Sequence, residues 1–159
     1  MGNVGSTVLS FLVEDWIVEG EPDLVFLETA VNDGDYLLES GDTQGLGRAV
    51  EGIVRQLKTA LPDCEIVLVF NYLRTYMPVA RRTGTQAWAD GHLTEAEYAS
   101  LYHRAAPQLL SAVAAKYDLP TISTIPFFDA VGRGGHDALF RDDCHHTEAG
   151  GRLAASLVA

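Results

Sequence analysis

The chain has 159 residues, 47% of them hydrophobic, and a formal net charge of −11 at pH 7. This length and composition predict one globular domain over residues 1–159, and no apolar run reaches the roughly 18 residues that cross a bilayer. The acidic balance disfavours nucleic acids and anionic membranes as partners, because both are negatively charged. The sequence does not indicate a cellular compartment.

Two helices and two strands are predicted in the first half of the chain. Apolar residues recur at helical spacing in 6–18, which predicts a helix. Short apolar runs at 22–30 and 64–72 predict buried strands. Between them, residues 45–61 carry an apolar stripe on one face and are predicted to form an amphipathic helix.

The second half continues this alternation. Residues 94–119 show a long helical pattern, which Pro107 is expected to end or kink because proline has no backbone N–H. A third strand is predicted at 120–125. A last helix is predicted at 146–159, with Thr147 as its N-cap.

Short apolar strands that alternate with helices are typical of a parallel sheet covered on both faces. The predicted fold class is therefore α/β, a three-layer α/β/α sandwich with a parallel sheet. Functional groups in such sheets gather at the carboxyl ends of the strands. Polar clusters follow each predicted strand: NDGD at 32–35, NYLRTY at 71–76 and, further on, DDCHH at 142–146.

The segment 32–35 is compatible with two interpretations. Asparagine, aspartate and glycine tolerate turn geometry, so the segment could be a plain turn. Alternatively, Asn32 could point its side-chain amide into a cleft, where an amide N–H is a good donor to a developing oxyanion.

The cluster 142–146 is compatible with three interpretations. Asp142 could accept the Nδ1–H of His145 and leave Nε2 as a base. The same spacing fits a tight turn with a solvated acid. Together with His146 and His136, the pair could instead bind a metal ion.

Taken together, the two clusters resemble the SGNH (GDSL-type) hydrolase family, over residues 2 to about 155. Its third block, G-x-N-D after a strand, reads Ala30-Val31-Asn32-Asp33 here, with alanine in place of glycine. Its last block, D-x-x-H, reads Asp142 to His145, followed by Gly150. The second-block glycine is best matched by Gly5, in the segment GNVGST.

The resemblance implies a flavodoxin-like fold and a Ser-His-Asp esterase mechanism without a cofactor or metal ion. His145 would be the base and Asp142 its orienting acid. The amide of Asn32 and the backbone N–H of Gly5 would hold the oxyanion.

The family's first block, G-D-S-[LI], which carries the nucleophilic serine, does not occur in the sequence. We therefore expect the serine and the N-terminal strand or strands of the sheet to lie outside this chain, which would then be N-terminally truncated. Ser6 is a weaker alternative, because no apolar strand precedes it. Loss of the first strand would expose the edge of the strand at 22–30, which predicts self-association or pairing with another segment.

The long segment 73–93 follows the second strand, and long loops of this kind are often binding loops or mobile surface loops. Tyr72, Arg74 and Trp88 are the candidate substrate contacts there. Cys64 and Cys144 fit no zinc spacing, and we expect neither a disulfide between them nor a nucleophilic role for Cys144.

The leading interpretation is an esterase or deacetylase domain that acts on acylated carbohydrate or small esters. A non-catalytic relative that binds a ligand or partner is the first alternative, favoured by the missing serine and by Ala30. A metal-dependent hydrolase that uses the cluster 142–146 is the second.

Overall fold

The computed structural model describes residues 4–73, 101–131, 133–142 and 145–157. Within them, the parallel strands β1 (Leu24–Leu27), β2 (Glu65–Phe70) and β3 (Thr121–Ser123) form one sheet in the order β1-β2-β3. The helices are α1 (Ser6–Leu9), α2 (Val13–Trp16), the 3-10 turn η1 (Val18–Gly20), α3 (Ala30–Ser40), α4 (Thr43–Ala60), the π-helical η2 (Leu101–Ala105), α8 (Ala106–Tyr117), α9 (Ile125–Val131), α10 (Arg133–Leu139) and α11 (Glu148–Ser156).

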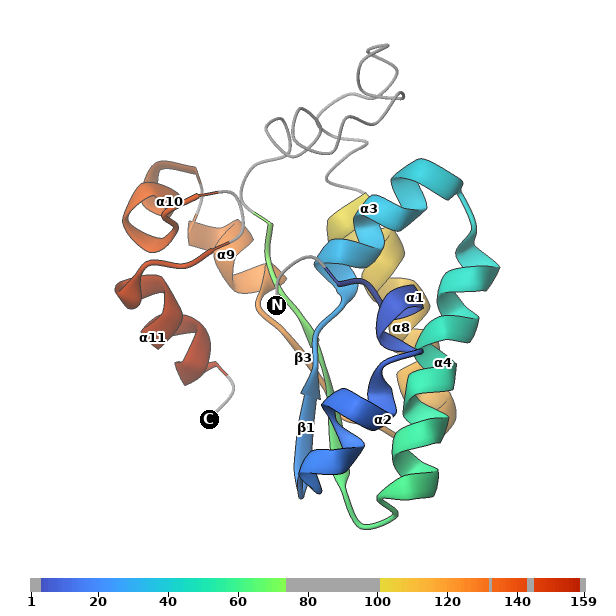
Figure 1. Ribbon diagram of the computed structural model, residues 1–159. Coiled ribbons are helices and arrows are strands. Elements are labelled where there is room, and N and C mark those ends of the chain that lie inside the picture. Colours follow the sequence, from blue (N-terminus) through green and yellow to red (C-terminus); the bar gives the residue numbers. More distant parts are fainter. Residues whose placement is uncertain (1–3, 74–100, 132, 143–144, 158–159) are drawn as a thin grey trace.

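Helices lie on both sides of the sheet. Figure 1 shows α1 to α4 and α8 on one side, and α9, α10 and α11 on the other. The parallel sheet and its two helical layers confirm the predicted α/β fold class. Because all three strands run the same way, their carboxyl ends lie at the same end of the sheet.

The core lies between β2 and the helix α4. All residues of β2 after Glu65 are buried. The apolar stripe predicted for α4 is also buried: Leu46, Val50, Ile53, Val54 and Leu57. Each such side chain contributes about 1.5–3 kcal/mol on removal from water. Asp42 caps α4 by accepting the N–H of Gly45 at 2.7 Å.

The helix predicted at 6–18 is interrupted. It divides into α1 and α2, with a turn at Ser10–Leu12. The side-chain amide of Gln56, on α4, donates to the carbonyl of Ser10 at 2.9 Å. This external partner occupies a carbonyl that would accept a backbone bond if the helix continued.

The strand predicted at 22–30 ends early, at Leu27, and Ala30 begins α3. The segment 32–35 is therefore helical, and its interpretation as a plain turn was wrong. Gly34 is needed for close packing, since a Cβ there would lie 2.4 Å from the ring of Tyr102.

In the second half, the third strand and the last helix are confirmed. Pro107 lies in the first turn of α8, where the π-helical stretch gives way to α-helix, and the chain stays helical from Leu101 to Tyr117. Two helices, α9 and α10, were not predicted. Each has seven residues, and glycines at 132, 134 and 135 obscure any apolar period there.

The strand β1 has one paired edge in the described part of the chain, the edge that faces β2. Its side chains alternate: Val25 and Leu27 are buried, whereas Leu24 and Phe26 are 44% and 52% exposed. None of the described helices has the length and apolar character needed to span a membrane.

Candidate active site

The carboxylate of Asp142 contacts the imidazole of His145. Nδ1 lies 2.8 Å from Oδ2 and 3.0 Å from Oδ1, and the backbone N–H of His145 donates to Oδ1 at 2.7 Å. Because an ionised carboxylate can only accept, these contacts place the ring hydrogen on Nδ1 and make Nε2 the basic nitrogen. The side chains of His145 and Asp142 are 58% and 46% exposed, so substrate and solvent can reach them.

The loop that carries this pair is fastened to α11. The N–H of Arg141 donates to the carbonyl of His145 at 3.0 Å, and the N–H of Thr147 donates to Leu139 at 2.9 Å. Thr147 caps α11 by accepting the N–H of Gly150 at 3.2 Å, as predicted. A Cβ at Gly150 would lie 1.9 Å from the carbonyl oxygen of Leu139, so only glycine allows this approach.

The adjacent His146 points into the protein. Its ring stacks on Phe128 at 5.3 Å and packs on Phe140 at 4.7 Å between centroids. Burial and the neighbouring imidazole of His145 lower the pKa of His146. Phe140 and His146 form a short antiparallel bridge. Consecutive residues of an extended segment face opposite ways, so the imidazole of His145 points away from that of His146.

The metal-binding interpretation is not supported by this arrangement. His136 is buried and places Nε2 2.9 Å from the carbonyl of Phe128. Over the described ranges, no three histidine, cysteine, aspartate or glutamate side chains are grouped so that they could hold a metal ion. Cys144 lies outside the described residues, and Cys64 is a buried, unbridged thiol whose pKa is raised by burial.

Asn32 and Gly5 are brought together from positions 27 residues apart. Asn32 lies in the first turn of α3, shortly after the carboxyl end of β1, and its side-chain amide donates to the carbonyl of Val4 at 3.2 Å. A Cβ at Gly5 would lie 3.6 Å from the backbone oxygen of Asn32. Two residues expected to donate to an oxyanion are therefore neighbours.

A buried tie between Asp33 and Ser6 holds these two segments. Both residues are fully buried, and Oδ1 of Asp33 accepts the backbone N–H of Ser6 at 2.7 Å and its hydroxyl at 2.9 Å. Burial raises the pKa of Asp33, while the hydrogen bonds from Ser6 oppose that rise. Ser6 as the nucleophile was wrong, because its hydroxyl is enclosed and committed to Asp33.

Tyr72 follows β2 and is 5% exposed. Its ring packs against His103, Phe128, His136 and Phe140. Its role as a substrate contact stays a prediction. Arg74 and Trp88, the other two candidate contacts, lie outside the described residues.

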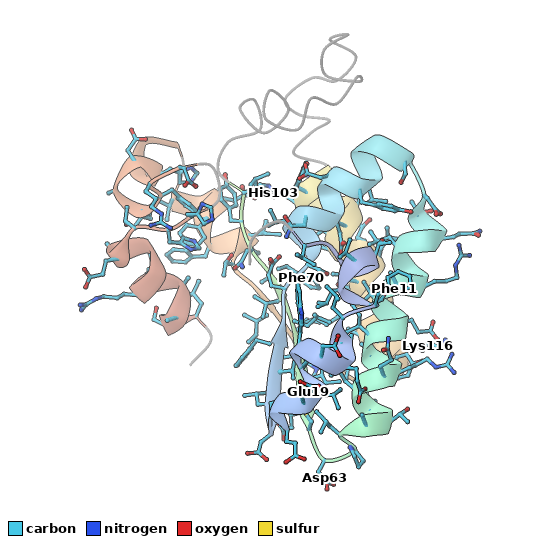
Figure 2. The ribbon with its side chains drawn as sticks, viewed as in Figure 1. Phe11, Glu19, Asp63, Phe70, His103 and Lys116 are labelled. Carbon is cyan, nitrogen blue, oxygen red and sulfur yellow. The ribbon has the colours of Figure 1, made fainter. Side chains whose placement is uncertain are left out.

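Two titratable side chains at this end of the sheet were not predicted. Figure 2 shows His103 here, whereas Glu19 and Asp63 lie at the opposite end. The Nε2 of His103 lies 3.3 Å from the backbone nitrogen of Leu73 and 3.2 Å from its oxygen, and burial lowers the pKa of His103. The other is Glu28, a carboxyl directly after β1; an acid inside the apolar run LVFLETA was the available signal.

The Asp142–His145 pair and the Gly5–Asn32 pair lie on different elements. In Figure 1, α3 lies on one side of the upper end of β2, and the loop between α10 and α11 lies on the other. Of the two pairs, Asn32 follows the carboxyl end of β1 closely, at the end where a parallel sheet gathers its functional groups.

A model of the GDSL-like lipase/acylhydrolase family matches residues 2–153. No protein of curated function matches the sequence significantly. Solved structures with a similar fold include an acetyl xylan esterase, AlAXEase, with a TM-score of 0.72 and 17% identity, over 99% of this chain and 76% of that one.

Two further structures are similar. A two-domain esterase, CEX, active on acetylated mannans and co-crystallised with mannopentaose, has a TM-score of 0.70 and 23% identity, over 99% of this chain. The chain spans only 35% of that esterase's length. The lipase/acylhydrolase from Enterococcus faecalis has a TM-score of 0.63 and 14% identity, over 98% of this chain and 69% of that one. At these identities the likeness shows the fold alone.

Proposed function

Because the chain belongs to the GDSL-like lipase/acylhydrolase family, we propose that it hydrolyses carboxylic esters, of acylated carbohydrate or of small alcohols. The observation that carries this proposal is the Asp142–His145 contact, which makes Nε2 the basic nitrogen on an exposed ring. Solved structures of similar fold include esterases described as acting on acetylated mannans and xylan, which supports an acetylated polysaccharide as the first substrate class to test.

In the proposed reaction, a serine hydroxyl attacks the acyl carbon while His145 Nε2 takes its proton. The carboxylate of Asp142 stabilises the imidazolium that forms. His145 then gives the proton to the leaving alcohol oxygen, and the ester C–O bond breaks. Water attacks the acyl-serine, His145 takes the water proton and returns it to the serine, and the carboxylic acid departs.

The carbonyl oxygen becomes negatively charged in both addition steps. The side-chain amide of Asn32 and the backbone N–H of Gly5 are the proposed donors to this oxyanion. The backbone of Asn32 lies beside Gly5, and this closeness supports a joint role, since donors to an oxyanion must come from neighbouring residues. Removal of one such donor typically lowers the rate about 10²–10³-fold.

We place the nucleophilic serine outside residues 1–159, because the G-D-S block is not in the sequence. The edge of β1 supports a missing strand beside it, since Leu24 and Phe26 leave an apolar strip exposed next to unpaired backbone groups. A second copy of the chain, or a separate segment, would cover this strip.

A second candidate function is ligand or partner binding without catalysis. Ala30 occupies the position where the family's third block has glycine, and it is buried. This replacement and the missing serine block favour a protein that has the family's fold but does not catalyse ester hydrolysis.

Hydrolysis of p-nitrophenyl acetate and release of acetate from acetylated mannan distinguish the two candidates. Each assay is run on this chain and on a form extended at its amino end by an apolar strand that ends in G-D-S. Hydrolysis by either form that disappears in His145→Ala supports an esterase. If both forms are folded and neither hydrolyses the esters, the esterase proposal is overturned in favour of a binding domain.

A further inference from the structure

Glu28 brings a carboxyl group to the meeting point of β1, β2 and α3. It follows β1 directly and precedes Thr29, the N-cap of α3. Its Oε1 accepts the backbone N–H of Val31 at 3.3 Å, and the backbone N–H groups of Ala30 and Asn71 also act on it. Since Asn71 directly follows β2, the carboxyl group reaches the carboxyl ends of two neighbouring strands.

The surroundings of Glu28 oppose its ionisation. Burial is the largest cause, and the negative charge of Asp33, from α3, adds to it; together they raise the pKa of Glu28 to about 7 despite the three N–H groups. Asp33 is the charged group that acts on Glu28 from the described part of the chain. Glu28 is therefore expected to change its charge near neutral pH.

The position of Glu28 links this charge to the proposed oxyanion donor. Val31, which donates to Glu28, is the residue before Asn32, so the carboxyl group and the amide of Asn32 share the first turn of α3. A negative charge here opposes a second negative charge on an oxyanion held by Asn32, and in a partly buried site that repulsion is poorly screened.

We propose that Glu28 is a positioning residue of the ester site: by accepting backbone N–H groups its carboxyl group holds the start of α3 so that Asn32 can bind an oxyanion, and its ionisation opposes that binding by placing a second negative charge in the same turn. The inference rests on the proposed function. Asp142 and His145 supply the base of the proposed reaction. We therefore expect activity to fall as Glu28 ionises.

The first test does not need catalysis. In 1H–15N spectra of the whole chain, the side-chain amide of Asn32 is identified by its loss in Asn32→Ala and followed from pH 5.5 to 8.5. We expect its shift to inflect near pH 7, and Glu28→Gln to abolish the inflection. Glu19→Gln, an exposed acid at the opposite end of the sheet in Figure 2, is the control and should leave the inflection in place. An Asn32 signal that is flat in the unmodified chain, or that still inflects in Glu28→Gln, would overturn the proposal.

The second test follows the rate of p-nitrophenyl acetate hydrolysis over the same pH range, with the form extended at its amino end by the strand that ends in G-D-S. The unmodified protein is expected to lose up to tenfold per pH unit above the inflection, whereas Glu28→Gln keeps a plateau. A falling limb that persists in Glu28→Gln overturns the proposal. If no form hydrolyses the ester, the proposed function fails, and the Asn32 titration still decides whether the two side chains are coupled.

Discussion

Oδ1 of Asp33 accepts two hydrogen bonds from Ser6, one from the backbone N–H at 2.7 Å and one from the hydroxyl at 2.9 Å. This tie joins the first helix to α3 inside the protein and sets Gly5 against Asn32. The tie is buried, so loss of the Asp33 carboxylate leaves both donors of Ser6 without their partner.

Asp33→Ala is therefore expected to lower the free energy of unfolding by about 2–4 kcal/mol, because it orphans the Ser6 N–H and opens a small cavity. Ser6→Ala removes one of the two bonds and should cost only about 1 kcal/mol. Urea unfolding followed by circular dichroism measures both. Equal effects of the two substitutions would contradict the assigned role of the Asp33 carboxylate.

The Asp142–His145 pair predicts a large effect on rate and a small one on stability. In the form extended by the G-D-S strand, Asp142→Asn should lower kcat about 10⁴-fold, since an amide favours the wrong imidazole tautomer. Both side chains are about half exposed, so the unfolding free energy should change by less than about 1 kcal/mol. Glu148→Gln, which removes an exposed ion pair with Arg152, is the control and should leave kcat unchanged.

Gly150 and Gly151 offer a matched pair of substitutions in one helix. Gly150→Ala would press a methyl group into the carbonyl of Leu139 and is expected to destabilise the protein by about 2 kcal/mol or more. Gly151→Ala meets nothing within 4 Å and should stabilise by about 0.5–1 kcal/mol through helix propensity. Thermal unfolding of the two variants gives the comparison, and a tolerated Gly150→Ala would show that the loop is packed differently.

The raised pKa of Glu28 predicts that the protein loses stability as pH rises. In the unfolded chain the carboxyl ionises near 4.5, and in the folded protein near 7, so the stabilisation is complete below 4.5 and is lost up to about pH 7. The loss is at most about 3 kcal/mol, and Glu28→Gln should flatten this part of the curve. Unfolding free energies at pH 5 and 8 measure the difference; equal pH dependence in the two proteins would place the titration elsewhere.

The exposed face of β1 predicts association between chains. Light scattering should show a mass that rises with protein concentration, and Phe26→Lys should abolish the rise, because a charge on an edge strand opposes pairing. Phe11→Lys is the control, since Phe11 is 83% exposed in the turn between α1 and α2, away from the strand edge. A monomer at every concentration would count against this surface as an interface.

Much of this architecture could be predicted from the sequence. The apolar runs of β1, β2 and β3 and the stripe of α4 are local signals, and Asp142 and His145 are close in the chain, so their pairing needs only a tight loop. The Gly5–Asn32 contact and the tie between Ser6 and Asp33 join distant segments, and no local pattern reports them. At the break between α1 and α2, the free carbonyl of Ser10 is bound by Gln56, a residue distant in the sequence. Glu28 was not predicted as a site residue. The apolar pattern of a strand predicts which side chains are buried, but it does not predict whether an acid at the end of the strand is charged.

The opposite orientations of His145 and His146 give this loop an intrinsic reporter. Reagents that acylate imidazole nitrogens, such as diethyl pyrocarbonate, should modify His145 first, because His146 is stacked against phenylalanine rings. Two neighbours in the chain would then differ sharply in labelling by mass spectrometry. Substrate or inhibitor that occupies the ester site would protect one imidazole and leave the other unaffected, so occupancy could be read without any turnover.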